Sequence, residues 1–139
     1  MINKSKTLNF LIILILIAII PFNFANSRKI ELGARYLKLG NTYREAKNYD
    51  KAIEFLKKGE MIANQDNTFN GKYWSAVAKE YYGYLYRDLG HFDEAKNYFR
   101  MAREDYRNII YQFDGSPAAT DELIIELSIQ ANAEIEKLL

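Results

Sequence analysis

Hydrophobic residues recur every three or four positions through most of this chain, which is the period of an amphipathic helix. The pattern is clearest between Lys79 and Arg103, where two apolar stripes flank Gly90. The first stripe contains Tyr82, Gly83, Tyr86 and Leu89, and the second contains Phe92, Ala95, Phe99 and Ala102. Glycine can adopt the left-handed conformation that ends a helix. We therefore expect a helical hairpin, in which the small Gly83 and Ala95 let two backbones approach closely.

The same periodicity predicts an all-α fold of about five helices. Their expected bounds are Ile30–Glu45, Asp50–Asn64, Lys72–Leu89, Asp93–Phe113 and Pro117–Leu138. The last helix has a start signal, because Ser116 is a favourable N-cap and Pro117 suits the first helical position. The predicted buried stripe of the first helix consists of Leu32, Tyr36, Leu39 and Tyr43, and that of the second of Ala52, Ile53, Leu56 and Gly59.

The chain also repeats itself at a constant offset of 43 residues. Leu39, Gly40, Tyr43, Tyr49 and Ala52 recur as Tyr82, Gly83, Tyr86, Phe92 and Ala95. At these positions the chain resembles the tetratricopeptide repeat (TPR) family, whose pattern is an aromatic residue, Leu-Gly, Tyr, a Gly-x-aromatic turn, Ala, an aromatic residue and Ala. The first copy matches it with Tyr36, Leu39, Gly40, Tyr43, Tyr49, Ala52, Leu56 and Gly59, and the second with Tyr82, Gly83, Tyr86, Gly90, Phe92, Ala95, Phe99 and Ala102.

The resemblance implies repeats over about 33–64 and 72–113, followed by a capping helix over about 117–138. Lys47 replaces the turn glycine of the first copy, Lys79 replaces the leading aromatic residue of the second, and both copies lack the family's closing proline. The usual repeat has about 34 residues, so about nine are extra here. We expect them in a longer second helix, ending near Ala63 and Asn64, and in the polar connection Gln65–Gly71.

The predicted fifth helix has two apolar stripes. One stripe contains Leu123, Leu127, Ala131, Ile135 and Leu138, and it would pack on Tyr106, Ile110 and Phe113 to cap the array. The other contains Ile125, Ile129 and Ala133. Two interpretations of the second stripe stay open at this point: a wide apolar face lying in a helix groove, or a surface for a homodimer through Ile125 and Ile129.

Residues 1–27 have the layout of an export signal. Lys4 and Lys6 precede an apolar block from Phe10 to Ile20, and Ala25-Asn26-Ser27 offers small residues for cleavage. The length of the block favours a cleaved signal peptide over a membrane anchor through residues 8–24, because a spanning helix needs about 20 apolar residues. Either alternative predicts an exported, periplasmic or otherwise extracytoplasmic domain over 28–139, and the richness in Ile, Lys, Asn and Tyr suggests a bacterial source.

Composition argues against several classes of function. Of the 19 basic residues, 17 remain after residues 1–27, against 18 acidic residues, so no nucleic acid or anionic membrane is expected as a partner. The chain has no cysteine and a single histidine, His91, so we expect no metal site and no cofactor. The acidic pairs Asp93-Glu94 and Asp121-Glu122 are better explained as helix starts than as catalytic carboxylates. An enzyme is therefore not expected.

The TPR resemblance implies a concave groove, lined by the first helix of each hairpin, that holds a partner peptide. The sides of these helices that are offset from the packing stripes carry Leu37, Asn41, Arg44, Val77, Glu80, Tyr81, Tyr84 and Arg87. We predict partner binding through Asn41, Arg44, Tyr81, Tyr84 and Arg87, since aromatic rings beside Asn and Arg supply contact area and hydrogen bonds. The alternative is a polar surface without a ligand. The family's carboxylate clamp is disfavoured, because Glu80 would repel a carboxylate.

The sequence thus predicts an exported TPR module that binds a partner protein or peptide along its concave face. The alternative is a membrane-tethered assembly or scaffold factor that self-associates through the fifth helix.

Overall fold

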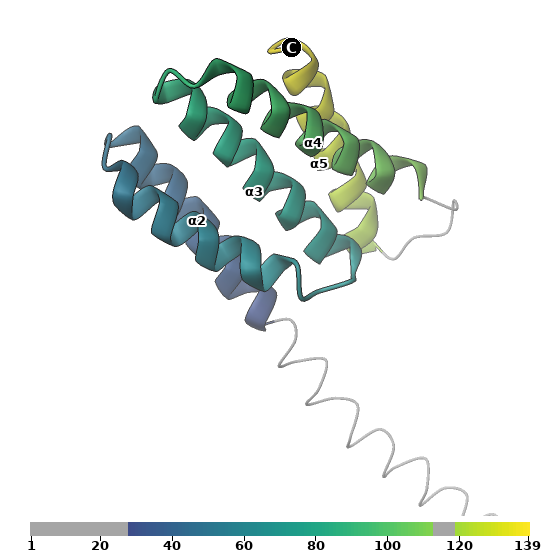
Figure 1. Ribbon diagram of the computed structural model, residues 1–139. Coiled ribbons are helices and arrows are strands. Elements are labelled where there is room, and N and C mark those ends of the chain that lie inside the picture. Colours follow the sequence, from purple (N-terminus) through teal and green to yellow (C-terminus); the bar gives the residue numbers. More distant parts are fainter. Residues whose placement is uncertain (1–27, 113–118) are drawn as a thin grey trace, which may run out of the picture.

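The computed structural model describes residues 28–112 and 119–139, and in this part of the chain every regular element is a helix. The helices are the first helix (residues 28–45), α2 (Tyr49–Ala63), α3 (Phe69–Asp88), α4 (Phe92–Tyr111) and α5 (Ala119–Glu136) (Figure 1). The predicted all-α class is confirmed. The helix bounds agree with the predicted ones to within three residues.

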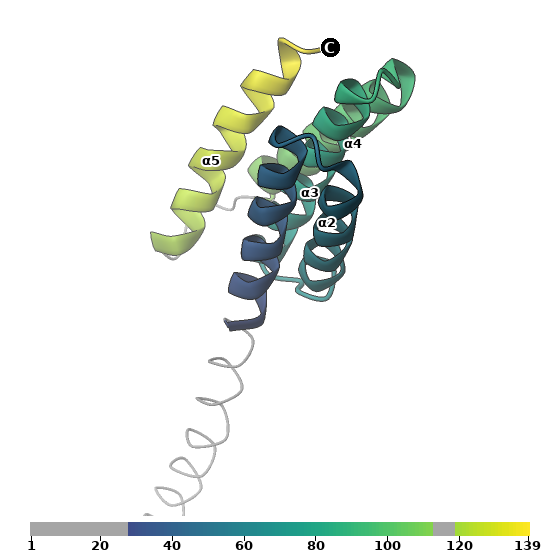
Figure 2. The same cartoon turned by 90° about the vertical axis from the view of Figure 1, so that its left-hand side faces the viewer.

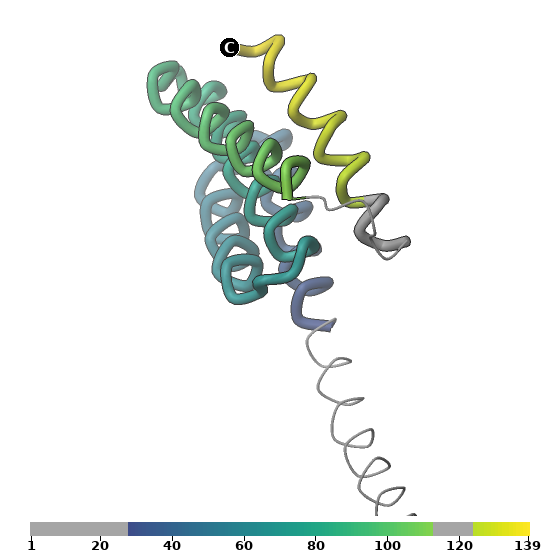
Figure 3. The backbone as a smooth tube through the Cα atoms, turned by 90° about the vertical axis from the view of Figure 1, so that its right-hand side faces the viewer, coloured from purple at the N-terminus to yellow at the C-terminus, as the bar shows by residue number. Residues whose placement is uncertain are grey.

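The helices pack side by side around α3, which contacts α2, α4 and α5. α3 lies in the middle of the molecule, between α2 and α4 (Figure 1). Viewed from the side, α5 and α2 lie on opposite sides of the first helix (Figure 2). The tube view shows α5 running along the outside of the second hairpin (Figure 3), where it packs on α4 and α3.

The 43-residue repeat is present in the backbone geometry of the two hairpin turns. Lys47 has a φ of 59° and Gly90 has a φ of 80°, so both adopt the left-handed conformation. The amide of Asn48 donates to the carbonyl of Tyr43 at 2.9 Å, and the amide of His91 donates to that of Tyr86 at the same distance. This is the hydrogen bond that closes a helix in a Schellman motif. Lys47 therefore adopts the left-handed backbone conformation that was expected of a glycine at this turn.

Close helix packing also repeats. A Cβ atom added to Gly40 would lie 2.8 Å from Leu56, and one added to Gly83 would lie 2.7 Å from the ring of Phe99. Both distances are shorter than real contacts of this kind. The prediction that Gly83 allows close approach of the helices is confirmed, and the first repeat uses Gly40 in the same way.

The buried face of the first helix differs from the predicted one by a shift in register. Leu39 is 38% exposed and Leu32 is 45% exposed, whereas Leu37 is fully buried. Gly33 and Gly40 are buried as well. The reason is that Leu37 points between the hairpin partner α2 and the neighbouring helix α3, where it joins a cluster with Ala52, Leu56, Ala78, Tyr82 and Leu85.

The second helix ends at Ala63, as predicted, but the extra residues of the repeat lie mainly in α3 and not in α2 or the connection. α2 has only 15 residues and the connection covers 64–68, while α3 has 20 residues. The helix begins early because Thr68 accepts a hydrogen bond from the amide of Gly71 at 3.2 Å, and Asp66 accepts one from the amide of Thr68 at 2.8 Å. The added turns of α3 bring Tyr73 and Trp74 into the fold.

α5 buries a different stripe from the predicted one. Ile124, Ile125, Ser128 and Ile135 are buried, and the three isoleucines belong to a core cluster with residues of α3 and α4. Of the predicted stripe, Ile135 is buried, Leu127 and Ala131 are half-buried, and Leu138 is exposed. The side chains of Leu123 and Phe113 lie outside the described residues. An ion pair between Arg107 and Glu136 at 2.7 Å adds a polar contact between α4 and α5.

The homodimer interpretation loses one of its two residues. Ile125 is only 9% exposed and Ile129 is 51% exposed, because α5 turns the former toward α4 and the latter to solvent.

The signal or anchor segment, residues 1–27, lies outside the described residues. Within the described part of the chain, no helix has the length and apolar character needed to cross a membrane.

Candidate partner-binding groove

A groove with a volume of about 410 Å³ lies between the first helix, α3 and α5, with α4 beneath it. Its outer walls are the first helix and α5, and the course of these two helices is seen in Figure 2. The residues that line the groove are Lys38, Tyr73, Trp74, Val77, Glu80, Tyr81, Tyr106, Leu127, Gln130, Ala131 and Glu134. The groove is therefore built from residues that are up to 96 positions apart, between Lys38 and Glu134.

Aromatic rings make much of the groove surface. The rings of Tyr73 and Trp74 meet edge to face with centroids 5.3 Å apart, and the ring of Tyr73 lies 5.9 Å from that of Tyr106. The ammonium of Lys38 lies 5.4 Å from the centroid of the Trp74 ring, which is the geometry of a cation–π contact. Because these rings support one another, the groove has a preformed wall.

Glu80 is the acidic group of the groove floor. It is half-buried, and one of its carboxylate oxygens accepts a hydrogen bond from the hydroxyl of Tyr106 at 2.8 Å. Burial raises the pKa of the Glu80 carboxyl above its usual value, hydrogen bonds from Tyr106 and Tyr84 oppose this shift, and the carboxylate of Glu134 adds to it. Among the described residues, no ion pair includes Glu80 or Glu134.

A second cluster lies where the first helix and α3 end. The guanidinium of Arg44 forms an ion pair with Asp88, and its Nε donates to the amide oxygen of Asn41 at 2.9 Å. The guanidinium carbons of Arg44 and Arg87 lie 5.4 and 5.0 Å from the centroid of the Tyr84 ring. This cluster joins the two hairpins through contacts within the chain.

The structure brings the five predicted binding residues to neighbouring positions, but only Tyr81 lines the groove itself. Asn41, Arg44, Tyr84 and Arg87 form the cluster at the end of α3. Burial raises the pKa of both Tyr81 and Tyr84 to about 12. Whether any of the five contacts a partner stays a prediction.

For the remaining residues, the predicted lining of the groove agrees with the structure only in part. Leu37, expected on the groove side, is buried between helices. Val77 and Glu80 do line the groove, as expected. Sequence reasoning missed Lys38, Tyr73, Trp74, Tyr106 and the residues of α5. A signal for Trp74 was available, because it precedes Val77 and Tyr81 at helical spacing on the same face.

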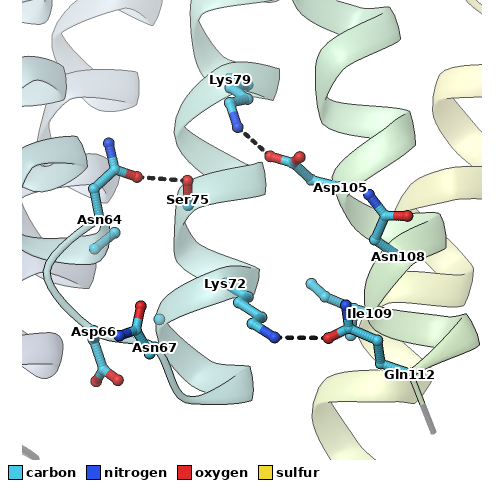
Figure 4. Close-up of a pocket in the computed structure, with 12 residues that line it drawn as sticks. Asn64, Asp66, Asn67, Lys72, Ser75, Lys79, Asp105, Asn108, Ile109 and Gln112 are labelled. Atoms are coloured by element: carbon cyan, nitrogen blue, oxygen red, sulfur yellow. Dashed lines mark hydrogen bonds and ion pairs between the residues drawn. The ribbon is translucent and has the colours of Figure 1, made fainter.

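A second pocket, of about 300 Å³, lies between the α2–α3 connection, α3 and α4 (Figure 4). Its polar side chains pair with one another: Lys79 with Asp105, Lys72 with Gln112 at 2.6 Å, and Ser75 with Asn64 at 2.7 Å. These pairs connect neighbouring helices and leave few groups for a ligand. The groove is the better candidate site, because it offers aromatic surface and two carboxylates, Glu80 and Glu134, that form no ion pair among the described residues.

The described side chains give no indication of catalysis. They contain no group of three or more His, Cys, Asp or Glu residues that could hold a metal ion. His91 is exposed at the start of α4, and Asp93 and Glu94 occupy the first turn of that helix. Acidic residues at this position complement the helix dipole, which is the structural role expected for them.

The comparison with protein families gives a match to the tetratricopeptide repeat over residues 34–66 and 78–107. Neither the curated proteins nor the solved structures include a significant match to this chain. Each matched segment covers most of one hairpin, and the residues between the matches include the added turns of α3. Over these two segments the chain is similar to the tetratricopeptide repeat, a family that generally mediates interactions between proteins, and the geometry of the two hairpins agrees with this similarity.

Proposed function

We propose that this protein binds a segment of a partner protein in the groove between the first helix, α3 and α5. The observation that carries the proposal is the groove itself, a hollow of about 410 Å³ whose walls come from both repeats and from α5. A concave site with aromatic walls and a few polar groups is the usual form of a binding site. Binding would be non-covalent, without a cofactor or metal.

The residues of the groove favour a peptide over a small ligand. The site is open at the surface and lies along α3, so that side chains from successive turns of the helix face it: Tyr73 or Trp74, then Val77, then Tyr81. Tyrosine and tryptophan provide large contact areas at a low cost in side-chain entropy. Such an arrangement suits an extended or helical segment that follows the direction of α3.

The test is selection of peptide ligands from a library of random 12-residue peptides, followed by affinity measurements on variants. Tyr81→Ala removes a half-buried ring from the groove wall. Tyr111→Ala is the matched control, since Tyr111 is 80% exposed and lies outside the groove. We expect Tyr81→Ala to weaken binding of the selected peptides about tenfold or more, and Tyr111→Ala to leave binding unchanged. Equal affinities of both variants and the unmodified protein would contradict the proposal.

We further propose that the domain works outside the cytoplasm. The support comes from the sequence of residues 1–27, in which two lysines precede an apolar block and a small-residue cleavage site. Intact mass of the protein from its native membrane and soluble fractions tests this. A chain that begins near Arg28 in the soluble fraction agrees with a cleaved signal, and a full-length chain in the membrane fraction agrees with an anchor. A full-length chain in the cytoplasmic fraction would contradict export.

The structure does not support self-association through α5. It required Ile125 and Ile129 on one open face, and Ile125 is packed in the core. The groove therefore remains the surface with the best-supported role.

A further inference from the structure

We propose that the groove selects partner segments with a basic side chain, and that the lysine or arginine group binds between Glu80 on α3 and Glu134 on α5. This inference rests on the proposed function and specifies the chemistry of the partner. It predicts the opposite charge preference from a groove that clamps a carboxylate.

The first argument is charge. Lys38, Glu80 and Glu134 are the three charged residues that line the groove, so its lining carries a net negative charge. Neither carboxylate has an ion-pair partner within the described part of the chain, although ion pairs are formed elsewhere by Arg44 and Asp88 and by Lys79 and Asp105. A cation from a partner would therefore meet two carboxylates without displacing an existing ion pair.

The second argument is the position of Lys38, the basic residue that lines the groove. Its ammonium lies over the ring of Trp74 instead of pairing with Glu80. The groove thus already holds one cation on its aromatic surface. Further aromatic surface lies near Glu80, because the hydroxyl of Tyr106 donates to this carboxylate and the ring of Tyr73 lies 5.9 Å from that of Tyr106. Aromatic faces attract cations in addition to carboxylates.

The third argument concerns acidic partners. The two arginines that were predicted to bind a partner make contacts within the chain, since Arg44 is bound to Asp88 and Asn41, and both Arg44 and Arg87 lie over Tyr84. An acidic side chain entering the groove would approach Glu80 and Glu134 with only Lys38 as a counter-charge. Like charges in a partly desolvated site disfavour binding.

The experiment uses the full chain in mild detergent and a phage library of random 12-residue peptides. Enriched peptides are synthesised with a fluorescein label and their Kd is measured by anisotropy. For each peptide, the basic residue is then replaced by norleucine and by glutamate. The protein variants are Glu80→Gln and Glu134→Gln, which keep size and hydrogen-bonding capacity. Glu126→Gln is the matched control, because Glu126 is an exposed acid on α5 that does not line the groove. Thermal unfolding checks that each variant is folded.

We expect enriched peptides to contain a lysine or arginine at a recurring position. Replacing it by norleucine, or replacing Glu80 by Gln, should raise the Kd about tenfold, as expected for loss of a charge-assisted contact in a partly buried site. Combining the two changes should add little, since they remove the same interaction.

Two results would overturn the proposal, and they differ in what they say about the groove. If enriched peptides lack basic residues but lose affinity in Tyr81→Ala, the charge preference is wrong and the groove still binds peptides. If no peptide is enriched, or if enriched peptides bind Tyr81→Ala normally, both the charge preference and the proposed function are wrong.

Discussion

The left-handed residue Lys47 provides a test of how strictly the first repeat follows the geometry of the second. An L-amino acid in this conformation costs roughly 1–2 kcal/mol. Glycine pays no such cost, but it loses roughly 0.5–1 kcal/mol more in backbone entropy on folding. Lys47 is exposed, so its replacement sacrifices no buried area. Lys47→Gly should therefore raise the free energy of unfolding by about 0.5–1 kcal/mol.

The second turn supplies the reciprocal variant. Gly90 has a φ of 80°, and a Cβ atom added to it would meet nothing within 4 Å. Gly90→Lys consequently introduces backbone strain without a steric clash, and it should lower the free energy of unfolding by about the amount that Lys47→Gly raises it. The protein with both changes should be close to the unmodified protein, because the two turns lie at the ends of different hairpins.

The assay is urea unfolding of residues 28–139, followed by circular dichroism, together with the thermal midpoint. For a domain of this size, the expected shift in Tm is roughly 2–5 °C, upward for Lys47→Gly and downward for Gly90→Lys. A decrease in stability for Lys47→Gly would refute the reasoning, since it would mean that the lysine side chain contributes more than its backbone conformation costs. An unchanged slope of the unfolding free energy against urea would show that only stability has changed.

Three further predictions follow from the packing. Gly83→Ala should destabilise the protein by about 1–3 kcal/mol, because its new methyl group would overlap the ring of Phe99, and Phe99→Leu in the same chain should recover part of the loss in urea unfolding. Ile125→Glu should prevent cooperative folding as judged by the thermal transition, whereas Ile129→Glu should change Tm by little, since only the first residue is buried. Burial raises the pKa of Tyr81 and Tyr84 to about 12 in the folded protein. The stability that these two residues contribute is therefore complete below pH 10 and declines as the pH rises from about 10 toward 12. A free energy of unfolding that stays constant over this interval in urea titrations would contradict the burial of these hydroxyls.

The sequence predicted the number and type of the helices, because period and turn signals are local properties of the chain. The 43-residue offset also predicted which residues are equivalent in the two hairpins. Gly40 with Leu56 and Gly83 with Phe99 are such equivalents, and their close contacts agree with it. The buried face of the first helix was predicted less well. Leu37 is buried because α3 covers it. Since α3 is distant from the first helix in the sequence, the hydrophobic period of the first helix does not indicate this contact.

Only part of the groove was predicted, because its lining also comes from helices that are distant in the sequence. Tyr81 was identified because it lies beside the repeat pattern. Trp74 lies within the predicted helix Lys72–Leu89, but it was missed because the groove side of that helix was predicted only from Val77 onward. The connection Gln65–Gly71 was assigned to a loop, whereas Asp66 and Thr68 cap a helix that begins at Phe69. The wall formed by α5 was missed because Leu127 and Ala131 were expected to pack on α4. The predicted Ile135 is buried, but it is joined in the core by Ile124 and Ile125.

The central position of α3 has a consequence for how the protein unfolds. One core cluster contains Ala76 and Val77, the other contains Ala78 and Tyr82, and both include Trp74 at their margins. In long repeat arrays, single repeats can open while their neighbours stay folded. Here neither hairpin can unfold by itself without exposing apolar residues of the other, because α3 contributes to both core clusters. The two repeats and α5 should therefore fold and unfold in a single cooperative transition, with no stable half.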